Sequence, residues 1–210
     1  MIKEKFGEKL EQAIQSGLPF LFKREIDPNI LSIGGAGVCC ASALALGFGE
    51  FFLGSVLLAL GGLFDLVDGI VARHFGVETR FGAFLDSTLD RLVDMVVLLA
   101  LVIHYAVTGD PFVASVAGLC LVTSVLTSYA KARADAMGVH LPGGVVERGE
   151  RILLIALGGF LGFMEPALWI LALGSVVTVA QRFEAARRGL SQSSGDSGEK
   201  NSGGEWLHEK

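Results

Sequence analysis

Two long apolar stretches that carry acidic residues constrain this chain most strongly. Residues 51–70 and 82–107 are each about as long as the ~20 residues that a helix needs to cross a bilayer. Where the two stretches approach each other along the chain, they hold four aspartates: Asp65, Asp68, Asp86 and Asp90. Because one carboxylate at the centre of a membrane helix costs roughly 2.5–3.5 kcal/mol, four unpaired ones would cost on the order of 10 kcal/mol. A bound cation would offset that cost.

The spacing of the aspartates places them on shared helical faces. Asp65 and Asp68 are three residues apart, and Gly82, Asp86 and Asp90 recur every four residues, so each set lies on one side of its helix. A short connection makes the two helices antiparallel and brings both acid pairs near one membrane surface. Carboxylate oxygens are the ligands that Mg²⁺ and Mn²⁺ prefer, and these ions also bind phosphate oxygens. The sequence therefore predicts a divalent-metal site.

The residues around these aspartates resemble a known family. They match every position of the CDP-alcohol phosphotransferase signature, which in this chain reads Asp65-x2-Asp68-Gly69-x2-Ala72-Arg73-x8-Gly82-x3-Asp86-x3-Asp90. The resemblance extends over about residues 28–187. It implies an enzyme that moves a phosphoalcohol from a CDP-linked donor to an acceptor hydroxyl and releases CMP.

The resemblance also implies a role for each residue of the signature. The aspartates would bind two divalent cations, Mg²⁺ or Mn²⁺, which hold the CDP diphosphate. Asp90, at the acceptor side of this metal site, would also be the catalytic general base. The residues expected to contact the CDP group are Asp68, Gly69, Ala72, Arg73 and Gly82. Taken without the resemblance, the glycines could instead permit close helix packing, and Arg73 could reach toward the membrane interface.

A second set of candidate site residues is cationic. It comprises Lys131, Arg133, Arg148, Arg151 and Arg182. Residues 128–134 and 147–151, with Gln181 and Arg182, resemble the branch of the family that contains phosphatidylinositol-phosphate and archaetidylinositol-phosphate synthases. Arginine binds phosphate through two parallel hydrogen bonds, whereas an uncharged alcohol would not offset the desolvation of so many cations. We therefore expect a phosphorylated alcohol as acceptor, with inositol phosphate preferred. Alternatively, these are basic residues of the ordinary kind found at a cytoplasmic membrane surface.

Other activities remain open from the sequence. Within the same family, the acceptor could be glycerol 3-phosphate, as in a phosphatidylglycerophosphate synthase, or the donor a soluble CDP-inositol, as in a di-inositol phosphate synthase. Outside the enzymes, the acids could line a cation or proton pathway in a transporter. A transporter would place ionisable groups nearer the bilayer midplane and often contains inverted repeats. We find no such repeat.

The whole chain is predicted to be an all-α integral membrane protein. Residues 1–27 form an amphipathic helix on the membrane surface, because apolar residues recur there every four positions, although a helix of a soluble core would show the same stripe. Residues 28–188 form the enzyme domain, and residues 189–210, rich in Ser, Gly and charge, form a disordered cytoplasmic tail. Six transmembrane helices are expected: 30–48, 51–70, 82–107, 112–129, a short fifth one beginning near residue 145, and 167–187.

The basic residues predict the orientation. All 17 Lys and Arg lie at the N-terminus, near the second and fourth connections, or after the sixth span. The positive-inside rule then places both termini and the aspartates on the cytoplasmic side of the cell membrane. The expected partners are membrane lipids and a CDP-linked lipid donor, namely CDP-diacylglycerol or an ether analogue. The resemblance implies a homodimer, and no nucleic acid is expected.

Overall fold

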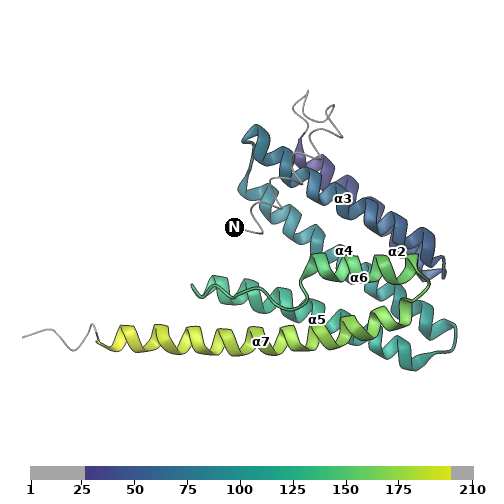
Figure 1. The fold of residues 1–210 in the computed structure, drawn as a ribbon. Coiled ribbons are helices and arrows are strands. Elements are labelled where there is room, and N and C mark those ends of the chain that lie inside the picture. The colour runs from purple at the N-terminus through teal and green to yellow at the C-terminus, as the bar shows by residue number, and fades with distance from the viewer. Residues whose placement is uncertain (1–26, 200–210) are drawn as a thin grey trace, which may run out of the picture.

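The structure, a computed structural model, describes residues 27–199, which form six helices (Figure 1). They are α2 (Pro28–Gly47), α3 (Phe51–Phe75), α4 (Arg80–Val107), α5 (Pro111–Ala136), α6 (Arg148–Phe160) and α7 (Met164–Glu199). No strand occurs in this part of the chain. The prediction of an all-α protein is therefore confirmed, whereas the amphipathic helix expected at residues 1–27 falls almost entirely outside the described residues.

Local signals in the sequence explain where the helices begin and end. Asp27 and Asp110 each precede a proline at the start of a helix, and their carboxylates accept hydrogen bonds from the first-turn N–H groups of Asn29 (2.9 Å) and Val113 (3.0 Å). Capping of this kind satisfies backbone donors that a helix leaves free. At the end of α3, Gly76 adopts a left-handed conformation with φ of 63°, which glycine accepts without steric cost. The starts of these helices agree with those predicted.

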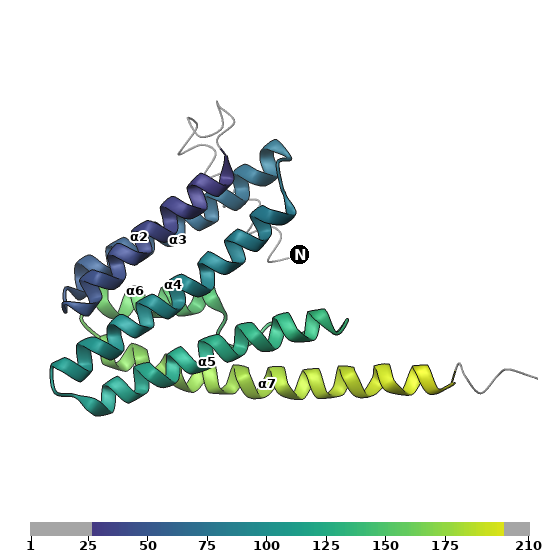
Figure 2. The same ribbon diagram turned by 180° about the vertical axis from the view of Figure 1, so that it is seen from behind.

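The six helices pack against one another in a closed ring. Around the ring the order of main contacts is α2, α3, α6, α7, α5, α4 and back to α2. Two views of the ribbon show α2, α3 and α4 as one arm and α5 and α7 as another (Figures 1 and 2). The arms converge at one end and diverge at the other, where α3 ends and α4 begins. The candidate site residues lie toward the diverging end.

Glycines allow α2 and α3 to pack closely. A β-carbon on Gly61 would lie 2.2 Å from the sulfur of Cys39, and one on Gly35 would lie 2.8 Å from the β-carbon of Phe64. Both distances are below van der Waals contact, so larger residues here would push the helices apart. Small residues serve the same purpose at many helix interfaces in membranes. This contact fixes α2 beside the acidic end of α3.

Four helices are long and apolar enough to span a membrane: α2, α3, α5 and α7. The chain is thus a multi-pass membrane protein. Of the two other helices, α4 has 28 residues but carries Asp86, Asp90, Arg91 and Asp94. The 13 residues of α6 extend about 20 Å, which is less than the ~30 Å hydrocarbon core of a bilayer. The predicted count of six spans is therefore not reached on length and composition alone.

The fifth helix begins three residues later than predicted. We expected a start near Val145, but α6 begins at Arg148. The preceding backbone is held in a non-helical form, because the N–H of Val146 donates to Oγ1 of Thr178 (2.9 Å) and the N–H of Glu147 donates to the carboxylate of Glu150 (3.1 Å). The side chain of Glu150 thus caps the helix and fixes its start.

The last helix is longer than predicted. α7 continues to Glu199, so residues 189–199, which were assigned to a disordered tail, are helical in the structure, while 200–210 lie outside the described residues. An ion pair one turn apart, Arg188 Nε to Glu184 Oε1 at 2.7 Å, supports the helix near this point.

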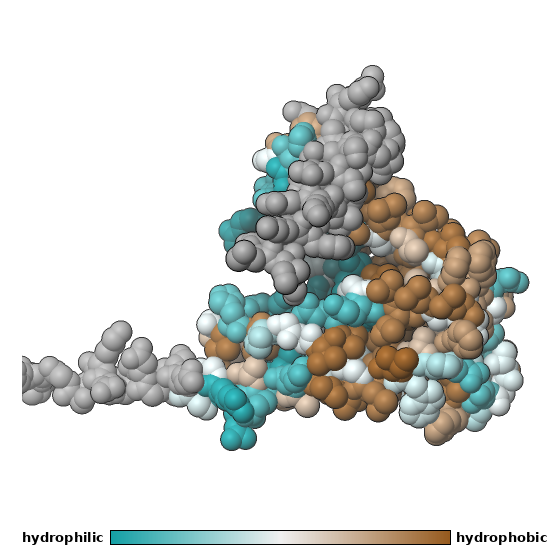
Figure 3. Space-filling view, viewed as in Figure 1, coloured by the Kyte–Doolittle hydropathy of each residue, from teal (hydrophilic) through white to brown (hydrophobic). Residues whose placement is uncertain are grey.

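Hydropathy separates the two ends of the molecule. Hydrophobic residues gather over the end where the arms converge, and hydrophilic ones lie along the opening between the arms (Figure 3). Many large apolar side chains face outward, among them Phe48, Val107, Phe112 and Leu173. Such exposure would be unfavourable in water and suits a lipid environment. A site for a polar ligand is therefore expected in the polar opening between the arms.

Candidate active site

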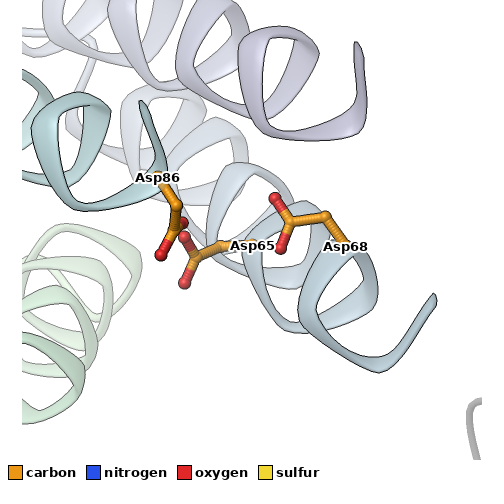
Figure 4. Close-up of side chains that lie close together, drawn as sticks. All are labelled: Asp65, Asp68 and Asp86. Atoms are coloured by element: carbon orange, nitrogen blue, oxygen red, sulfur yellow. The ribbon is translucent and has the colours of Figure 1, made fainter. Parts of the chain in front are cut away.

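Three carboxylates converge between α3 and α4. Asp65 and Asp68 lie near the end of α3 and Asp86 lies near the start of α4, and their side chains point toward one another (Figure 4). One oxygen from each carboxylate lies within 4.8 Å of the other two. A divalent cation bound roughly 2.1 Å from each oxygen needs only small side-chain rotations to contact all three. Three of the four predicted aspartates thus converge, and this group of oxygens can hold a divalent metal.

A serine from α2 orients one of these carboxylates. The hydroxyl of Ser32 donates a hydrogen bond of 2.5 Å to Oδ2 of Asp68, whose side chain is buried. The carbonyl oxygen of Pro28, 3.1 Å away, is a second acceptor for the same hydroxyl. Ser32 was not among the predicted site residues. Its only signal in the sequence is a hydroxyl in an apolar helix, and periodicity does not indicate which neighbour that hydroxyl meets.

Asp90 lies outside the three-carboxylate group, although we predicted it as a further metal ligand. Its Oδ1 lies 2.8 Å from Nη2 of Arg148, while Nη1 of the same arginine donates to Oδ2 of Asp65 at 2.6 Å. One guanidinium on α6 thus bridges carboxylates on α3 and α4. The sequence pattern grouped Arg148 with the acceptor-binding residues and gave no sign of this bridge.

The residues predicted to bind CDP all line one cavity. It has a volume of about 530 Å³ beside the carboxylates and is lined by Asp68, Gly69, Ala72, Arg73 and Gly82, together with Asn29, Ser32 and Thr79. A β-carbon on Gly82 would lie 3.0 Å from Oγ1 of Thr79 and 3.2 Å from Oδ1 of Asn29. Glycine therefore keeps this wall of the cavity open.

A second cavity, of about 210 Å³, brings together most of the predicted cations. Four predicted residues line it, namely Lys131, Arg148, Arg151 and Arg182, and Arg91 joins them. The acidic side chains in the same wall are Asp90, Asp94 and Glu147. Arg133 is not brought into this cavity and is exposed, because residues two apart on a helix face different directions. The cavity is thus cationic in balance.

Buried contacts fix two of these arginines. The guanidinium of Arg151 is ion-paired with Asp94, and the two side chains are 4% and 7% exposed. Arg182 donates to the carbonyl oxygen of Thr127 at 2.5 Å, and its other terminal nitrogen lies 3.5 Å from Glu147. The Nε atoms of Arg148, Arg151 and Arg182 are buried without a hydrogen-bond partner among residues 27–199. Unused donors of this kind suit an anionic ligand.

A very small space connects the two cavities. Its volume is about 10 Å³, which is room for a single water molecule. It shares Ser32, Asp65 and Asp86 with the first cavity, and Asp90 and Arg148 with the second. The two cavities themselves have no lining residue in common. Within residues 27–199, the small space where Arg148 contacts Asp65 and Asp90 thus lies between the two cavities.

Comparison with known proteins identifies the family. The family model described as CDP-alcohol phosphatidyltransferase matches residues 26–180, which include the three-carboxylate group and most of both cavities. The chain belongs to the CDP-alcohol phosphatidyltransferase family. The resemblance inferred from the aspartate signature is thereby confirmed.

Relatives of this phosphatidyltransferase carry more specific names. It is 38% identical over 184 residues to the phosphatidylinositol phosphate synthase of Streptomyces avermitilis, a match that covers 80% of this chain and 75% of the relative. Its fold resembles the crystal structure of phosphatidylinositol phosphate synthase from Mycobacterium tuberculosis in complex with manganese and citrate, with a TM-score of 0.74, 34% identity, and coverage of 84% of this chain and 88% of that one. The same mycobacterial enzyme with CDP-DAG bound gives a TM-score of 0.71 at 30% identity, covering 87% and 94%.

Proposed function

We propose that this protein is a membrane enzyme that transfers a phosphatidyl group from CDP-diacylglycerol, or an ether-lipid equivalent, to a hydroxyl of inositol phosphate and releases CMP. One observation carries the proposal: a cavity beside three converging carboxylates and a cavity lined by five cations lie on either side of a small space that Asp65 and Asp90 both line. The first suits a metal-bound diphosphate and the second a phosphorylated alcohol. The names of the relatives, and the CDP-DAG bound to one of them, support the same assignment.

The carboxylates would hold the metal. Asp65, Asp68 and Asp86 offer one oxygen each, and we propose two divalent cations, Mg²⁺ or Mn²⁺, in each site. The manganese in the mycobacterial relative supports this choice. When bound, the cations supply electrostatic stabilisation of the donor diphosphate and of the departing CMP. The chain's own contribution is to orient the ligands, as Ser32 orients Asp68, and to accommodate the nucleotide against Gly69, Ala72, Arg73 and Gly82.

Asp90 would act as the general base. Its carboxylate lines both the connecting space and the cationic cavity, so a hydroxyl arriving from the cationic side meets Asp90 next to the donor phosphate. The hydroxyl oxygen forms a new bond to phosphorus, the bond between phosphorus and the CMP oxygen breaks, and the hydroxyl proton passes to the Asp90 carboxylate. General-base catalysis of this kind contributes about 10²- to 10⁴-fold.

The cationic cavity would bind the acceptor phosphate. Lys131, Arg148, Arg151 and Arg182 line it, and guanidinium groups bind phosphate through charge-assisted hydrogen bonds. The Nε atoms of Arg148, Arg151 and Arg182 are buried without a partner among residues 27–199, and a buried donor left unsatisfied costs about 1–3 kcal/mol, so an anionic acceptor suits this cavity better than free inositol. Because Arg133 lies outside this cavity, we assign it no contact with the acceptor.

We propose that all six helices cross the membrane, with residues 28–188 as the enzyme domain and residues 1–27 as a surface helix. Most charges of α4 and α6 are compatible with this, because Asp86, Asp90, Arg91, Asp94, Arg148 and Arg151 line the cavities or the space between them and need not face lipid. Concentration of basic residues at the diverging end supports a cytoplasmic site and cytoplasmic termini in the cell membrane. The family resemblance supports a homodimer, which light scattering of the detergent-solubilised protein would test.

The function is tested by supplying donors and acceptors to the purified full-length protein in liposomes. Labelled CDP-diacylglycerol is mixed with inositol phosphate, free inositol or glycerol 3-phosphate, with and without Mn²⁺, and the lipids are separated by thin-layer chromatography. We expect phosphatidylinositol phosphate as the main product, formed only with metal. Preferential labelling with glycerol 3-phosphate would show that glycerol 3-phosphate is the acceptor. Turnover only when soluble CDP-inositol replaces CDP-diacylglycerol would show that CDP-inositol is the donor. No turnover with any pair would defeat the enzymatic assignment.

A further inference from the structure

Arg148 stands at the boundary between the two cavities. It is the first residue of α6, and its side chain lines both the small connecting space and the cationic cavity. Both terminal nitrogens are engaged, one with Asp65 at 2.6 Å and the other with Asp90 at 2.8 Å. The guanidinium therefore lies between the place where the donor would bind and the place where the acceptor would bind.

This bridge competes with the reacting arrangement. The guanidinium binds Oδ2 of Asp65 and Oδ1 of Asp90 and neutralises negative charge that a cation held by the three-carboxylate group would also use. In addition, the connecting space of about 10 Å³ holds about one water, whereas an acceptor oxygen and a donor phosphorus must come into contact there. The reacting complex therefore needs Arg148 to move out of this space.

We infer that Arg148 is a positioning residue that couples metal binding to acceptor binding. Without metal, its guanidinium neutralises Asp65 and Asp90 and closes the connection between the cavities. When a divalent cation binds the three-carboxylate group, the cation takes over this neutralisation, and the guanidinium turns into the cationic cavity, where it adds donors for the acceptor phosphate. The inference rests on the proposed function, since it assigns an order to the two ligands of that site.

The surroundings of the three arginines indicate that Arg148 is the one able to change partners. Its side chain is 25% exposed, whereas those of Arg151 and Arg182 are 4% and 8% exposed and are held by Asp94 and by the carbonyl of Thr127. From its fixed backbone position, the long Arg148 side chain already lines both spaces. The proposed change therefore involves only the side chain of Arg148.

If the guanidinium of Arg148 and a divalent cation compete for the same negative charge, metal binding and acceptor binding are thermodynamically coupled. If metal frees Arg148 for the acceptor, the metal must tighten acceptor binding, and the acceptor must tighten metal binding by the same factor. Couplings of this type are typically about 5- to 150-fold. Removing the guanidinium should abolish the part of the coupling that it transmits and, at the same time, strengthen metal binding to the acceptor-free enzyme, because a competing cation is gone.

The test measures binding without turnover, in the full-length protein and without donor. Mn²⁺ binding is followed by electron paramagnetic resonance and inositol phosphate binding by calorimetry, for the natural chain and for Arg148→Gln. In the natural chain, we expect saturating Mn²⁺ to tighten inositol phosphate binding by about 5- to 150-fold. In Arg148→Gln, inositol phosphate should bind equally with and without Mn²⁺, and Mn²⁺ alone should bind several-fold more tightly, about 1 kcal/mol by the standard relation.

Controls separate this inference from the proposed function. Arg148→Met, which keeps an unbranched apolar stem but no charge, serves as a second variant if Arg148→Gln does not fold, and Arg182→Gln should weaken inositol phosphate binding but preserve the coupling. If both Arg148 variants keep the natural coupling, or bind Mn²⁺ no more tightly than the natural chain, the inference is overturned. Failure of the natural chain to bind inositol phosphate, or Mn²⁺ binding that survives Asp68→Asn, would instead count against the proposed function.

Discussion

The guanidinium of Arg151 on α6 is paired with the carboxylate of Asp94 on α4 where both side chains are almost completely withdrawn from solvent. The hydroxyl of Ser124 on α5 lies 3.4 Å from the same carboxylate. The pair joins helices that are not main neighbours in the ring. It therefore gives Arg151 a structural task in addition to its place in the wall of the cationic cavity.

The first prediction follows from this burial. Removing one partner of a buried ion pair leaves an uncompensated polar or charged group and typically costs about 3–5 kcal/mol. We expect Asp94→Asn and Arg151→Gln each to lower the midpoint of thermal unfolding in detergent, and the double variant to recover part of the loss. Glu184→Gln, which breaks an exposed pair with Arg188, is the control and should have little effect. Additive losses in the double variant would mean that the pair itself contributes nothing.

The second prediction concerns the acceptor. Arg182→Ala removes a charge-assisted hydrogen bond, worth roughly 1.5–3 kcal/mol, and should raise the KM for inositol phosphate by about 10- to 150-fold. The KM for CDP-diacylglycerol should change little, because the proposed donor site lies at the aspartates. Steady-state kinetics in mixed micelles provide the measurement. Arg133→Ala, an exposed cation outside the cavity, is the matched control, and an equal effect of both substitutions would contradict the assignment.

The third prediction tests Ser32 as the residue that orients Asp68. Outer-shell partners of metal ligands typically contribute about 10- to 100-fold to metal affinity, so Ser32→Ala should weaken Mn²⁺ binding by that factor. Ser115→Ala is a close control. Its hydroxyl also bonds to the proline carbonyl four residues earlier, and none of its bonds reaches a candidate ligand. The idea fails if titration with Mn²⁺ gives the same dissociation constant for both variants.

The fourth prediction concerns the wall of the donor cavity. Gly82→Ala places a methyl group 3.0 Å from Thr79 and 3.2 Å from Asn29, which should narrow the cavity and raise the KM for CDP-diacylglycerol by about 5- to 10-fold, or roughly 1 kcal/mol. The acceptor KM should stay within error. On α5, a methyl group on Gly118 would meet nothing within 4 Å, so Gly118→Ala is the reference. A donor KM that is equal in the two variants would remove Gly82 from the binding site.

The fifth prediction separates the base from the metal ligands. Asp90→Asn should retain binding of CDP-diacylglycerol and lower kcat by about 10²- to 10⁴-fold, the usual contribution of a general base. Asp68→Asn should instead lose metal and donor binding, and a chelator should abolish turnover of the natural chain. Equilibrium binding of a labelled donor and single-turnover rates distinguish the cases. Normal turnover in Asp90→Asn would exclude its role as base.

Helix geometry explains why so much of the aspartate site was predictable. The positions of Asp65 and Asp68, three residues apart, fix their common face, and the short connection brings Asp86 opposite them. The prolines after Asp27 and Asp110 likewise fixed the starts of α2 and α5. Each of these features depends on residues that are close in the sequence.

Contacts between distant helices could not be predicted in the same way. The bridge from Arg148 to Asp65 spans 83 positions, and that from Arg151 to Asp94 spans 57. No periodicity within a single helix specifies such pairs. For the same reason the sequence does not predict that Asp90 contacts Arg148 or that Arg133 lies outside the cationic cavity, since charge and proximity in sequence do not reveal which side chains meet inside the ring.

The two cavities are lined by entirely different residues, and they meet only at a few side chains. With the roles proposed for the two cavities, substitutions on α5, α6 and α7 can change recognition of the alcohol while the proposed donor side, built on α2, α3 and α4, stays unchanged. Natural selection could thus retarget the enzyme from one headgroup to another in small steps without rebuilding its chemistry. Because the two cavities can change separately, this fold allows enzymes with new headgroup specificities, and therefore new membrane lipids, to evolve.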